Sequence, residues 1–503
     1  MRYRFRRILR MNAAWRGIPR TPGRRDRNCG ALVRRCRRLL ACAAVLASAA
    51  NMGAVTQAQT LTPIVRFDGE DGSEPLPGLL LARSGDFYGA TSSGGADGGG
   101  SIFSMTPDGS LDTLVNFNTV QGRGPNAVLV QAADGTFYGT TGFGGANSKG
   151  SVFKMTPSGA VTIMYSFCSQ SGCADGELPQ AALVQGVDGD FYGTTTSGGA
   201  GGEGTVYKIS PAGSLTTLYS FCSQNSCADG AQPEGVLIQG TDGNFYGTTS
   251  LGGALGDGSV FMLTTSGTLT TLYSFCSQSR CNDGGYPAAG VIQGSDGDFY
   301  ETTLLGGANN DGTVFKITPS GTLTTLHSFD YTDGYKPIAG LVLASDGNFY
   351  GTTPFGGFDS NGTIYRITPD GGFALLYEFC TGDCADGYYP VGRLVQALSG
   401  RFYGVNENGG PDAHGNIFVF NAGLAPFIKA EPGSGLVGSR VQILGNDLAG
   451  ATSVTFNGVA ATFTVVSGSE IRTAVPSGAT SGSIEVTTSD GTLESNRIFA
   501  VIP

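Results

Sequence analysis

The sequence predicts an all-β protein whose main part is a seven-bladed β-propeller, and three observations carry this prediction. A Phe-Tyr pair recurs at steps of 50–54 residues, starting at Phe87, Phe137, Phe191, Phe245, Phe299, Phe349 and Phe402. Each repeat holds four short runs of β-forming residues separated by turn signals. Glycine contributes 82 residues and hydrophobic residues 40%, which excludes collagen-like and disordered chains. Four strands in about 50 residues match one propeller blade.

The third repeat shows the expected strands most clearly. Strand a is predicted at residues 183–185, strand b at 191–195, strand c at 206–209 and strand d at 215–221. Asp188-Gly189 joins strands a and b, and we expect a type I′ turn there, in which both central residues need positive φ. A second tight turn, at residues 211–213, joins strands c and d. The b–c and d–a connections are long.

The number of strands at the two ends predicts how the ring closes. Strands b and c each occur seven times, but strand d follows strand c only six times. A seventh segment of the strand d type, residues 63–67, precedes the first strand a, and the last repeat ends after strand c. We therefore expect the N-terminal segment to complete the seventh blade and hide its edge. The propeller is predicted to span residues 61–421.

The C-terminal part, residues 425–503, abandons the repeat. Short alternating segments with Asn-Gly and Asp-Gly turns at residues 457–458 and 490–491 predict a small immunoglobulin-like β-sandwich. Because this part contains no cysteine, we expect no disulfide between its sheets. It would serve as a spacer or a docking module.

The first 58 residues are typical of an export signal. Four arginines at positions 34, 35, 37 and 38 precede an apolar run, residues 39–50, and small residues follow. This order is that of a secretory leader, and the apolar run is too short to span a membrane. We therefore expect an exported protein, secreted, periplasmic or at the cell surface, without a transmembrane segment after the leader.

Charge separates the leader from the rest of the chain. The leader holds 14 of the 30 basic residues and one of the 40 acidic ones, so 16 basic and 39 acidic residues remain after it. A surface this acidic argues against nucleic acid and anionic membranes as partners. It suits a soluble monomer that binds a glycan, an extracellular protein or a cation.

Eight of the eleven cysteines follow the leader in close pairs. The predicted disulfides are Cys168–Cys173, Cys222–Cys227, Cys276–Cys281 and Cys380–Cys384, because paired cysteines at repeated spacing in an exported chain indicate disulfides. Zinc is the weaker interpretation, since the pairs lie in different repeats and histidine is almost absent.

Two families share these motifs. The repeat DGxFYGTTxxGGAxxxGxVFKITPxGxLTTLYSF resembles the GloVer tandem repeat of bacterial exported "choice-of-anchor" proteins. The C-terminal part resembles an IPT/TIG domain through residues 438–439, 443–445, 454–458 and 474–476. The first resemblance implies a secreted or surface protein and brings no established activity or cofactor. The chain has no recognisable C-terminal anchor, which favours secretion over surface attachment.

The long b–c and d–a loops are expected on one face of the ring, which we call the loop face, and binding groups collect on such loops. A repeated aspartate lies in the d–a loops at Asp71, Asp175, Asp229, Asp283, Asp333 and Asp386. Aromatic residues accompany it at Tyr286, Tyr331, Tyr335, Tyr388, Tyr389, Phe143, Phe355 and Phe358. Aromatic rings stack on sugars, and carboxylates accept hydrogen bonds or bind cations. The competing interpretation of each aspartate is a turn-forming side chain.

Two further interpretations concern metal and catalysis. Asp68, Glu70 and Asp71 cluster as candidate calcium ligands, although without EF-hand spacing, and no cofactor other than calcium is expected. Catalytic residues would break the repeat, which makes Glu301, Arg280, Glu407 and His414 the candidates. His327, which replaces a strand d tyrosine, is expected in packing.

The leading prediction is a non-enzymatic exported binding or scaffold protein that presents the loop face to a glycan or a protein. The alternatives are a carbohydrate-active enzyme, a lyase or a glycosidase, that uses loop-face carboxylates, and a calcium-dependent adhesin.

Overall fold

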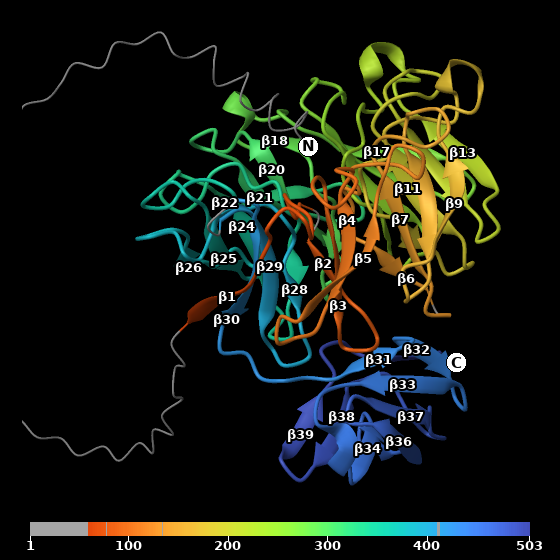
Figure 1. Ribbon diagram of the computed structural model, residues 1–503, viewed down its shortest axis with the longest axis vertical. Coiled ribbons are helices and arrows are strands. Elements are labelled where there is room, and N and C mark those ends of the chain that lie inside the picture. The colour runs from red at the N-terminus through yellow and green to blue at the C-terminus, as the bar shows by residue number, and fades with distance from the viewer. Residues whose placement is uncertain (1–58, 77, 133, 410–412, 503) are drawn as a thin grey trace, which may run out of the picture. The chain divides into compact units, whose positions relative to one another are not determined.

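The computed structural model describes residues 59–502 apart from residues 77, 133 and 410–412. The repeats form seven antiparallel sheets, and in each sheet strand b pairs with strand a on one side and strand c on the other (Figure 1). The predicted leader, residues 1–58, lies outside the described residues. Across the described ranges, no helix is long and apolar enough to cross a membrane.

The first four sheets each contain strands a to d in order. The first sheet consists of β2 (Leu79–Leu81), β3 (Phe87–Thr91), β4 (Ser101–Met105) and β5 (Leu111–Asn116). The second consists of β6 (Val130–Gln131), β7 (Phe137–Thr141), β8 (Ser151–Met155) and β9 (Val161–Ser166). The third consists of β10 (Val184–Gln185), β11 (Phe191–Thr195), β12 (Thr205–Ile209) and β13 (Leu215–Ser220). The fourth consists of β14 (Ile238–Gln239), β15 (Phe245–Thr249), β16 (Ser259–Leu263) and β17 (Leu269–Ser274).

The fifth and seventh sheets add one short strand from the d–a loop. The fifth sheet consists of β18 (Gly285–Pro287), β19 (Ile292–Gln293), β20 (Phe299–Leu305), β21 (Thr313–Ile317) and β22 (Leu323–Ser328). The sixth consists of β23 (Val342–Leu343), β24 (Phe349–Thr353), β25 (Thr363–Ile367) and β26 (Phe373–Glu378). The seventh consists of β27 (Tyr388–Pro390), β28 (Val395–Gln396), β29 (Phe402–Asn408), β30 (Asn416–Asn421) and β1 (Thr60–Arg66).

The N-terminal strand completes the seventh sheet, as the strand count predicts. β1 pairs antiparallel with β30, from Thr60 opposite Asn421 to Arg66 opposite Asn416, and Figure 1 shows the two strands side by side. The register shifts between Pro63 and Val65. Each of the other six strand c–strand d pairs also contains a register shift. β1 therefore pairs with its strand c in the same way as strand d does in the other repeats.

Strands b and c form the core of every sheet. All residues of the strand b motif, such as Phe191–Thr195, are buried. The glycine in this motif leaves room for the aromatic ring of the facing strand c residue: a Cβ added at Gly193 would lie 2.6 Å from Oη of Tyr207. The period-2 pattern of β strands therefore places a ring where the glycine has no side chain.

Two series of aromatic contacts connect each sheet to the next. In the first series, the tyrosine of one Phe-Tyr pair packs on the phenylalanine of the following pair, with ring centroids 4.0–4.5 Å apart. In the second, the phenylalanine that ends strand d packs on the strand c ring of the next sheet at 5.1–5.4 Å. Both series have seven steps and return from the seventh sheet to the first. Such stacked and tilted pairs add to the free energy gained by burying the rings.

The turn between strands a and b differs from the type I′ turn that we expected. In the third repeat only Gly189 has a positive φ, 85°, and it donates a hydrogen bond to the carbonyl of Gly186. Asp188 stays outside the positive region, and its side chain accepts hydrogen bonds from the Asp190 amide and the Tyr192 hydroxyl. The aspartate therefore acts through its side chain, and the glycine alone adopts the left-handed conformation.

The C-terminal part has its own core, as the sandwich prediction requires. One sheet contains β31 (Lys429–Glu431), β33 (Arg440–Leu444), β37 (Glu470–Ala474) and β36 (Phe463–Ser467). Another contains β35 (Val459–Ala460), β34 (Ser453–Phe456), β38 (Ile484–Thr488) and β39 (Gly491–Glu494), and β32 (Ser434–Leu436) pairs with β40 (Ala500–Ile502). Ile443, Phe456 and Ile471 are among the residues buried between them.

Candidate functional site

One β-bridge, repeated in all seven sheets, carries variable side chains on the long loops. In each repeat a residue of the d–a loop pairs with a residue of the b–c loop. The pairs are Ser73–Ser93, Arg123–Phe143, Glu177–Ser197, Ala231–Leu251, Gly285–Leu305, Tyr335–Phe355 and Tyr388–Asn408. A constant backbone with side chains that change from repeat to repeat is a feature of binding loops on a rigid scaffold.

The residue that follows the first member of each bridge is held in the left-handed region. These residues are Glu74, Gly124, Leu178, Gln232, Tyr286, Lys336 and Tyr389, with φ between 53° and 64°. Six of them are not glycine, so each conformation costs on the order of 1–3 kcal/mol. Backbone hydrogen bonds to the preceding repeat hold it: the Lys336 amide donates to the Asp311 carbonyl at 2.9 Å, and the Tyr389 amide donates to the Asn361 carbonyl at 3.0 Å. The backbone strain is kept in every repeat although the residue type changes, and strained loop positions of this kind are candidates for a functional site.

Aromatic side chains at these positions, together with Tyr331, form a continuous row across the sixth and seventh sheets. Tyr331 lies 5.3 Å from Tyr335 between ring centroids, and Tyr335 lies 6.1 Å from Phe355. Phe355 in turn contacts Tyr389 at 5.1 Å, and Tyr389 contacts Tyr388 at 4.9 Å. Five rings from three loops are thus in contact. We call Tyr331, Tyr335, Phe355, Tyr388 and Tyr389 the aromatic row.

The row is partly exposed to solvent and contacts a buried lysine. Tyr331 is 42% exposed and the other four rings are half-buried, while Phe358, on the same b–c loop as Phe355, is 86% exposed. The Nζ atom of Lys336 lies 4.9 Å from the centroid of the Tyr335 ring, while the residue itself is only 6% exposed. A cation over an aromatic face is attracted by the ring quadrupole, which fixes the ring in place.

Beside the row lies a carboxyl group that ionises with difficulty. Glu407 is at the end of β29, and its buried Oε2 atom has no hydrogen-bond partner among the described residues. Burial, and next the charge of Glu74, raise the pKa of Glu407 to about 7. Burial, and then Tyr388, Glu407 and Tyr331, raise the pKa of Tyr389, which links the carboxyl group to the aromatic row. Two carboxyl groups, those of Glu407 and Glu74, thus interact where the seventh sheet meets the first, and Glu407 connects them to the aromatic row. We call this place the seam between the seventh and first sheets.

The repeated aspartates are occupied by hydrogen bonds inside their own loops. Asp175, Asp229 and Asp283 have no exposed surface. Asp229 accepts hydrogen bonds from the Tyr219 hydroxyl at 2.8 Å and from the Ser223 and Gln224 amides at 2.9 and 3.2 Å. Burial acts to raise its pKa, but these hydrogen bonds outweigh it, and the pKa of Asp229 lies below the usual range.

The remaining aspartates of the set are held in a similar way. Asp333 lies 2.8 Å from the His327 Nε2 atom, and Asp386 accepts from the Tyr377 hydroxyl at 2.8 Å. Asp71 accepts from the Asp68 amide at 3.1 Å. This geometry favours the turn-forming interpretation of all six aspartates. The stacking of His327 on Phe373, with centroids 3.8 Å apart, agrees with a packing role for this histidine.

The predicted calcium ligands also take part in hydrogen bonds with backbone amides. Asp68 accepts hydrogen bonds from the Glu70 and Asp71 amides at 2.9 and 3.2 Å. Within the described ranges, three potential metal-ligand atoms converge at two places only, around Cys168, Cys173 and Glu177 and around Asp257, Cys276 and Cys281. Both places contain disulfide sulfurs, which are not thiolate ligands, so neither fits a metal centre.

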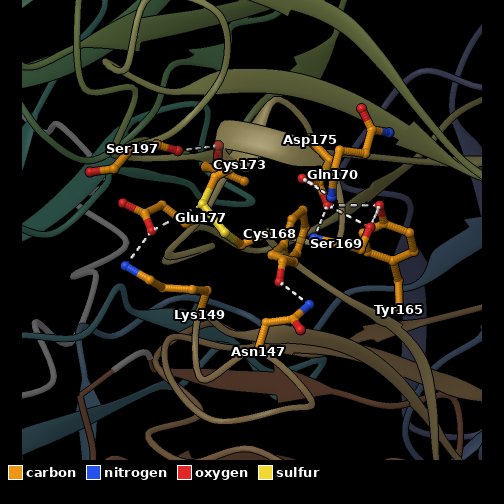
Figure 2. The surroundings of a disulfide bond; sticks show 12 residues. Asn147, Lys149, Tyr165, Cys168, Ser169, Gln170, Cys173, Asp175, Glu177 and Ser197 are labelled. Carbon is orange, nitrogen blue, oxygen red and sulfur yellow. Dashed lines mark hydrogen bonds and ion pairs between the residues drawn. A yellow bond between two sulfur atoms is a disulfide. The ribbon is translucent and has the colours of Figure 1, made fainter.

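The four predicted disulfides are present: Cys168–Cys173, Cys222–Cys227, Cys276–Cys281 and Cys380–Cys384. Figure 2 shows the first of them at the base of its d–a loop, between the Asp175 hydrogen bonds and the Lys149–Glu177 ion pair. The Lys149 Nζ and Glu177 Oε2 atoms are 2.5 Å apart. Covalent and polar contacts thus hold the loop that carries the variable bridge, and Glu177 takes part in both the ion pair and the bridge.

The four residues that break the repeat lie in different surroundings. Glu301 in β20 is fully buried and accepts hydrogen bonds from the Ala289 and Gly290 amides at 3.1 and 2.9 Å. Its burial removes it from any dissolved substrate. Arg280 is exposed in a short 3₁₀ turn, Ser279–Cys281. The His414 ring lies against Gly69, and Glu407 alone of the four adjoins the aromatic row.

Two other predicted aromatic residues, Phe143 and Tyr286, occupy the bridge position or the left-handed position in other repeats. Phe143 is the b–c member of the bridge in the second sheet, and Tyr286 is the left-handed residue of the fifth. Sequence reasoning missed Lys336. This residue precedes the proline of its d–a loop, as Glu74 does, and an alignment of the seven repeats on that proline would have placed both with Tyr286 and Tyr389.

Comparisons with known proteins were made for sequence and for structure. The model of the Gloeobacter/Verrucomicrobia repeat matches residues 48–185, 168–292, 222–418 and 275–460. The model of the IPT/TIG domain matches residues 428–499. No curated protein matches the sequence.

Among solved structures, a fungal alcohol oxidase of the AA5 family, in complex with copper, matches with a TM-score of 0.52 and 12% identity, over 89% of this chain and 100% of the oxidase. The extracellular domain of a hybrid two-component system from B. thetaiotaomicron matches with a TM-score of 0.48 and 13% identity, over 88% of this chain and 58% of that one. At these identities the similarity concerns the fold alone.

Proposed function

Because the chain belongs to the Gloeobacter/Verrucomicrobia repeat family and ends in an IPT/TIG domain, we propose that it is an exported binding protein whose loop face recognises a glycan. Four disulfides support an oxidising compartment outside the cytoplasm. The repeats act as a scaffold, and the C-terminal domain acts as a spacer.

The seven sheets are, in this proposal, the blades of a seven-bladed β-propeller over residues 61–421. The two seven-step series of aromatic contacts support it, since the tyrosine of the seventh sheet returns to the phenylalanine of the first. The pairing of β1 with β30 supports it as well. A closed ring leaves no unpaired edge and holds the loops in a fixed arrangement.

The aromatic row is the observation that carries the glycan assignment. Five rings joined by four contacts offer apolar faces for the C–H faces of sugar units, and the Tyr331, Tyr335, Tyr388 and Tyr389 hydroxyls can bond sugar hydroxyls. The strained backbone and the Lys336 cation fix the rings before binding, which reduces the entropy lost on association. A row of this kind suits an extended oligosaccharide.

A glycan array tests the proposal. The native protein should bind a defined class of oligosaccharides, and the double variant Tyr335→Ala/Tyr389→Ala should lose this binding. The matched control is Leu251→Ala, which changes the same bridge position as Phe355 in the fourth sheet. Absence of glycan binding by the native protein, or equal binding by the double variant and the control, would refute the proposal.

Glu407 favours a second candidate function, hydrolysis or elimination on the bound glycan. A carboxyl group with a pKa of about 7, with an unbonded buried oxygen in the described part of the chain, is suited to general acid–base chemistry near neutral pH. Release of reducing sugar or of an unsaturated product from an array-positive polysaccharide would show it. Activity that disappears in Glu407→Gln while binding persists assigns this role to Glu407; an inactive native protein removes the candidate.

A further inference from the structure

Lys336, beside the aromatic row, combines a buried side chain with unused hydrogen-bond donors. The residue is 6% exposed, and its Nζ atom lies 4.9 Å from the centroid of the Tyr335 ring. Among the described residues, no carboxylate or carbonyl forms an ion pair with this atom or accepts a hydrogen bond from it. A buried ammonium group without hydrogen-bond acceptors is costly in free energy. Lys336 therefore needs an account beyond the orientation of one ring.

The fourth sheet shows how a polar side chain at the same position can be satisfied. Gln232 follows the first member of its bridge as Lys336 does, and its Nε2 atom donates to the Glu203 Oε2 atom at 3.1 Å. Asp311 takes the place of Glu203 before Lys336, since its carbonyl accepts the Lys336 amide at 2.9 Å. Its carboxylate, one methylene shorter, forms no ion pair with Lys336 in the described structure. The ammonium group lies over the Tyr335 ring instead.

Negative charge surrounds Lys336 at a distance, although hydrogen-bond acceptors do not contact it in the described part of the chain. Burial, and next the charge of Asp330, raise the pKa of Asp311, whereas the charge of Lys336 acts in the opposite direction. The three loops that carry the row, residues 330–336, 354–361 and 380–389, contain one basic residue, Lys336. Their five acidic residues are Asp330, Asp333, Asp359, Asp383 and Asp386. Of these, Asp330, Asp359 and Asp383 are exposed, so the surroundings of the row are acidic apart from Lys336.

This distribution of charge distinguishes between classes of sugar. Exposed carboxylates repel an acidic sugar, and Lys336 repels an amino sugar next to Tyr335, because like charges brought together in an interface are unfavourable. The hydroxyl oxygens of a neutral sugar can accept hydrogen bonds from the ammonium group, and such charge-assisted bonds are stronger than neutral ones. We propose that the aromatic row binds a neutral oligosaccharide and that Lys336 anchors it through hydrogen bonds from Nζ to sugar hydroxyls. This inference rests on the glycan assignment above and names the class of glycan.

The test is calorimetric titration with the neutral oligosaccharide that binds best on the glycan array. Lys336→Met keeps an unbranched side chain without donors, and it should weaken binding about tenfold or more, as expected for the loss of a hydrogen bond to a charged group. Lys336→Arg keeps a charged donor and should bind more tightly than Lys336→Met. The matched control is Gln232→Met, which removes the donor at the equivalent position of the fourth sheet and should bind like the native protein. Lys336→Met should melt no lower than the native protein, because it removes a buried charge, so its weaker binding would not reflect unfolding.

The class of glycan has a separate readout. On an array that carries neutral, uronic-acid and amino-sugar oligosaccharides, the neutral ones should bind best. Their affinity should hardly change between about 0.05 and 0.5 M sodium chloride, because no ion pair with the ligand is screened. A preference for uronic acids or amino sugars, or native affinity in Lys336→Met, would overturn this inference and leave the glycan assignment standing. Failure of the native protein to bind any glycan would refute the glycan assignment and this inference with it.

Discussion

Tyr403 of the seventh sheet packs on Phe87 of the first, with ring centroids 4.1 Å apart. The two residues are far apart in the chain, yet their contact has the same form as the six others in the series, such as Tyr192 on Phe245 at 4.0 Å. The seventh sheet therefore packs on the first through the same aromatic contact that joins the other neighbouring sheets.

Tyr403→Ala tests whether the seam between the seventh and first sheets stabilises the fold. Loss of a buried aromatic side chain should lower the free energy of unfolding by about 3–5 kcal/mol. Tyr403→Phe keeps the ring and loses the 3.1 Å hydrogen bond from the hydroxyl to the Pro107 carbonyl, which should cost about 1 kcal/mol. Denaturant unfolding measures both. An alanine variant as stable as the phenylalanine variant would show that the seam contributes little.

Glu301 predicts an unusual dependence of stability on pH. Burial raises the pKa of this group from 4.5 to about 8. The folded protein therefore keeps a proton that the unfolded chain releases, so stability should fall as pH rises from about 4.5 to about 8. The slope approaches roughly 1.4 kcal/mol per pH unit for one proton.

Glu301→Gln removes this titration with little change of shape. Unfolding at pH 5 and pH 8 should show a larger loss of stability in the native protein than in the glutamine variant, which keeps the contribution of Glu407, whose pKa is also raised. Glu301→Gly restores the residue found at this position in the other six repeats and should reduce the loss in the same way. Parallel stability curves for the native protein and Glu301→Gln would contradict the account of Glu301.

The repeated aspartates should matter for stability and not for binding. Asp229→Ala leaves the Ser223 and Gln224 amides and the Tyr219 hydroxyl without their acceptor. Loss of these buried hydrogen bonds should lower the free energy of unfolding by at least about 2 kcal/mol. Because the folded-state pKa of Asp229 is depressed, its contribution is present above the pKa of the unfolded chain and disappears as pH falls through the acid range. Glycan affinity that falls in Asp229→Ala at unchanged stability would assign it to the site instead.

The Cys168–Cys173 disulfide closes a short loop. In the chain-entropy model, a loop of about six residues stabilises the fold by about 2 kcal/mol. The double variant Cys168→Ser/Cys173→Ser should therefore melt at a lower temperature and respond less to reductant than the native protein. Its glycan binding should be unchanged, because the aromatic row belongs to the sixth and seventh sheets. Unaltered melting would show that the Asp175 and Glu177 contacts hold this loop without the disulfide.

The sequence was sufficient to predict most of the fold. The seven Phe-Tyr pairs predicted the number of sheets. The segment of the strand d type at residues 63–67, which precedes the first strand a, predicted the pairing of β1 with β30. The turn type was wrong, because Asp188 contributes through its side chain. The candidate site was harder to predict from the sequence than the fold. Glu74 and Glu407 lie in the first and the last repeat, and only the fold brings their charges close enough to interact.

The central claim is that the aromatic row binds a glycan, and calorimetric titration with the best oligosaccharide from the array tests it most directly. Phe355→Ala lies in the middle of the row, and Leu251→Ala changes the equivalent position of the fourth sheet. The account predicts roughly two- to twelvefold weaker binding for Phe355→Ala, since loss of an aromatic stacking contact costs about 0.5–1.5 kcal/mol, and native affinity for Leu251→Ala. Equal affinities of the two variants would contradict it.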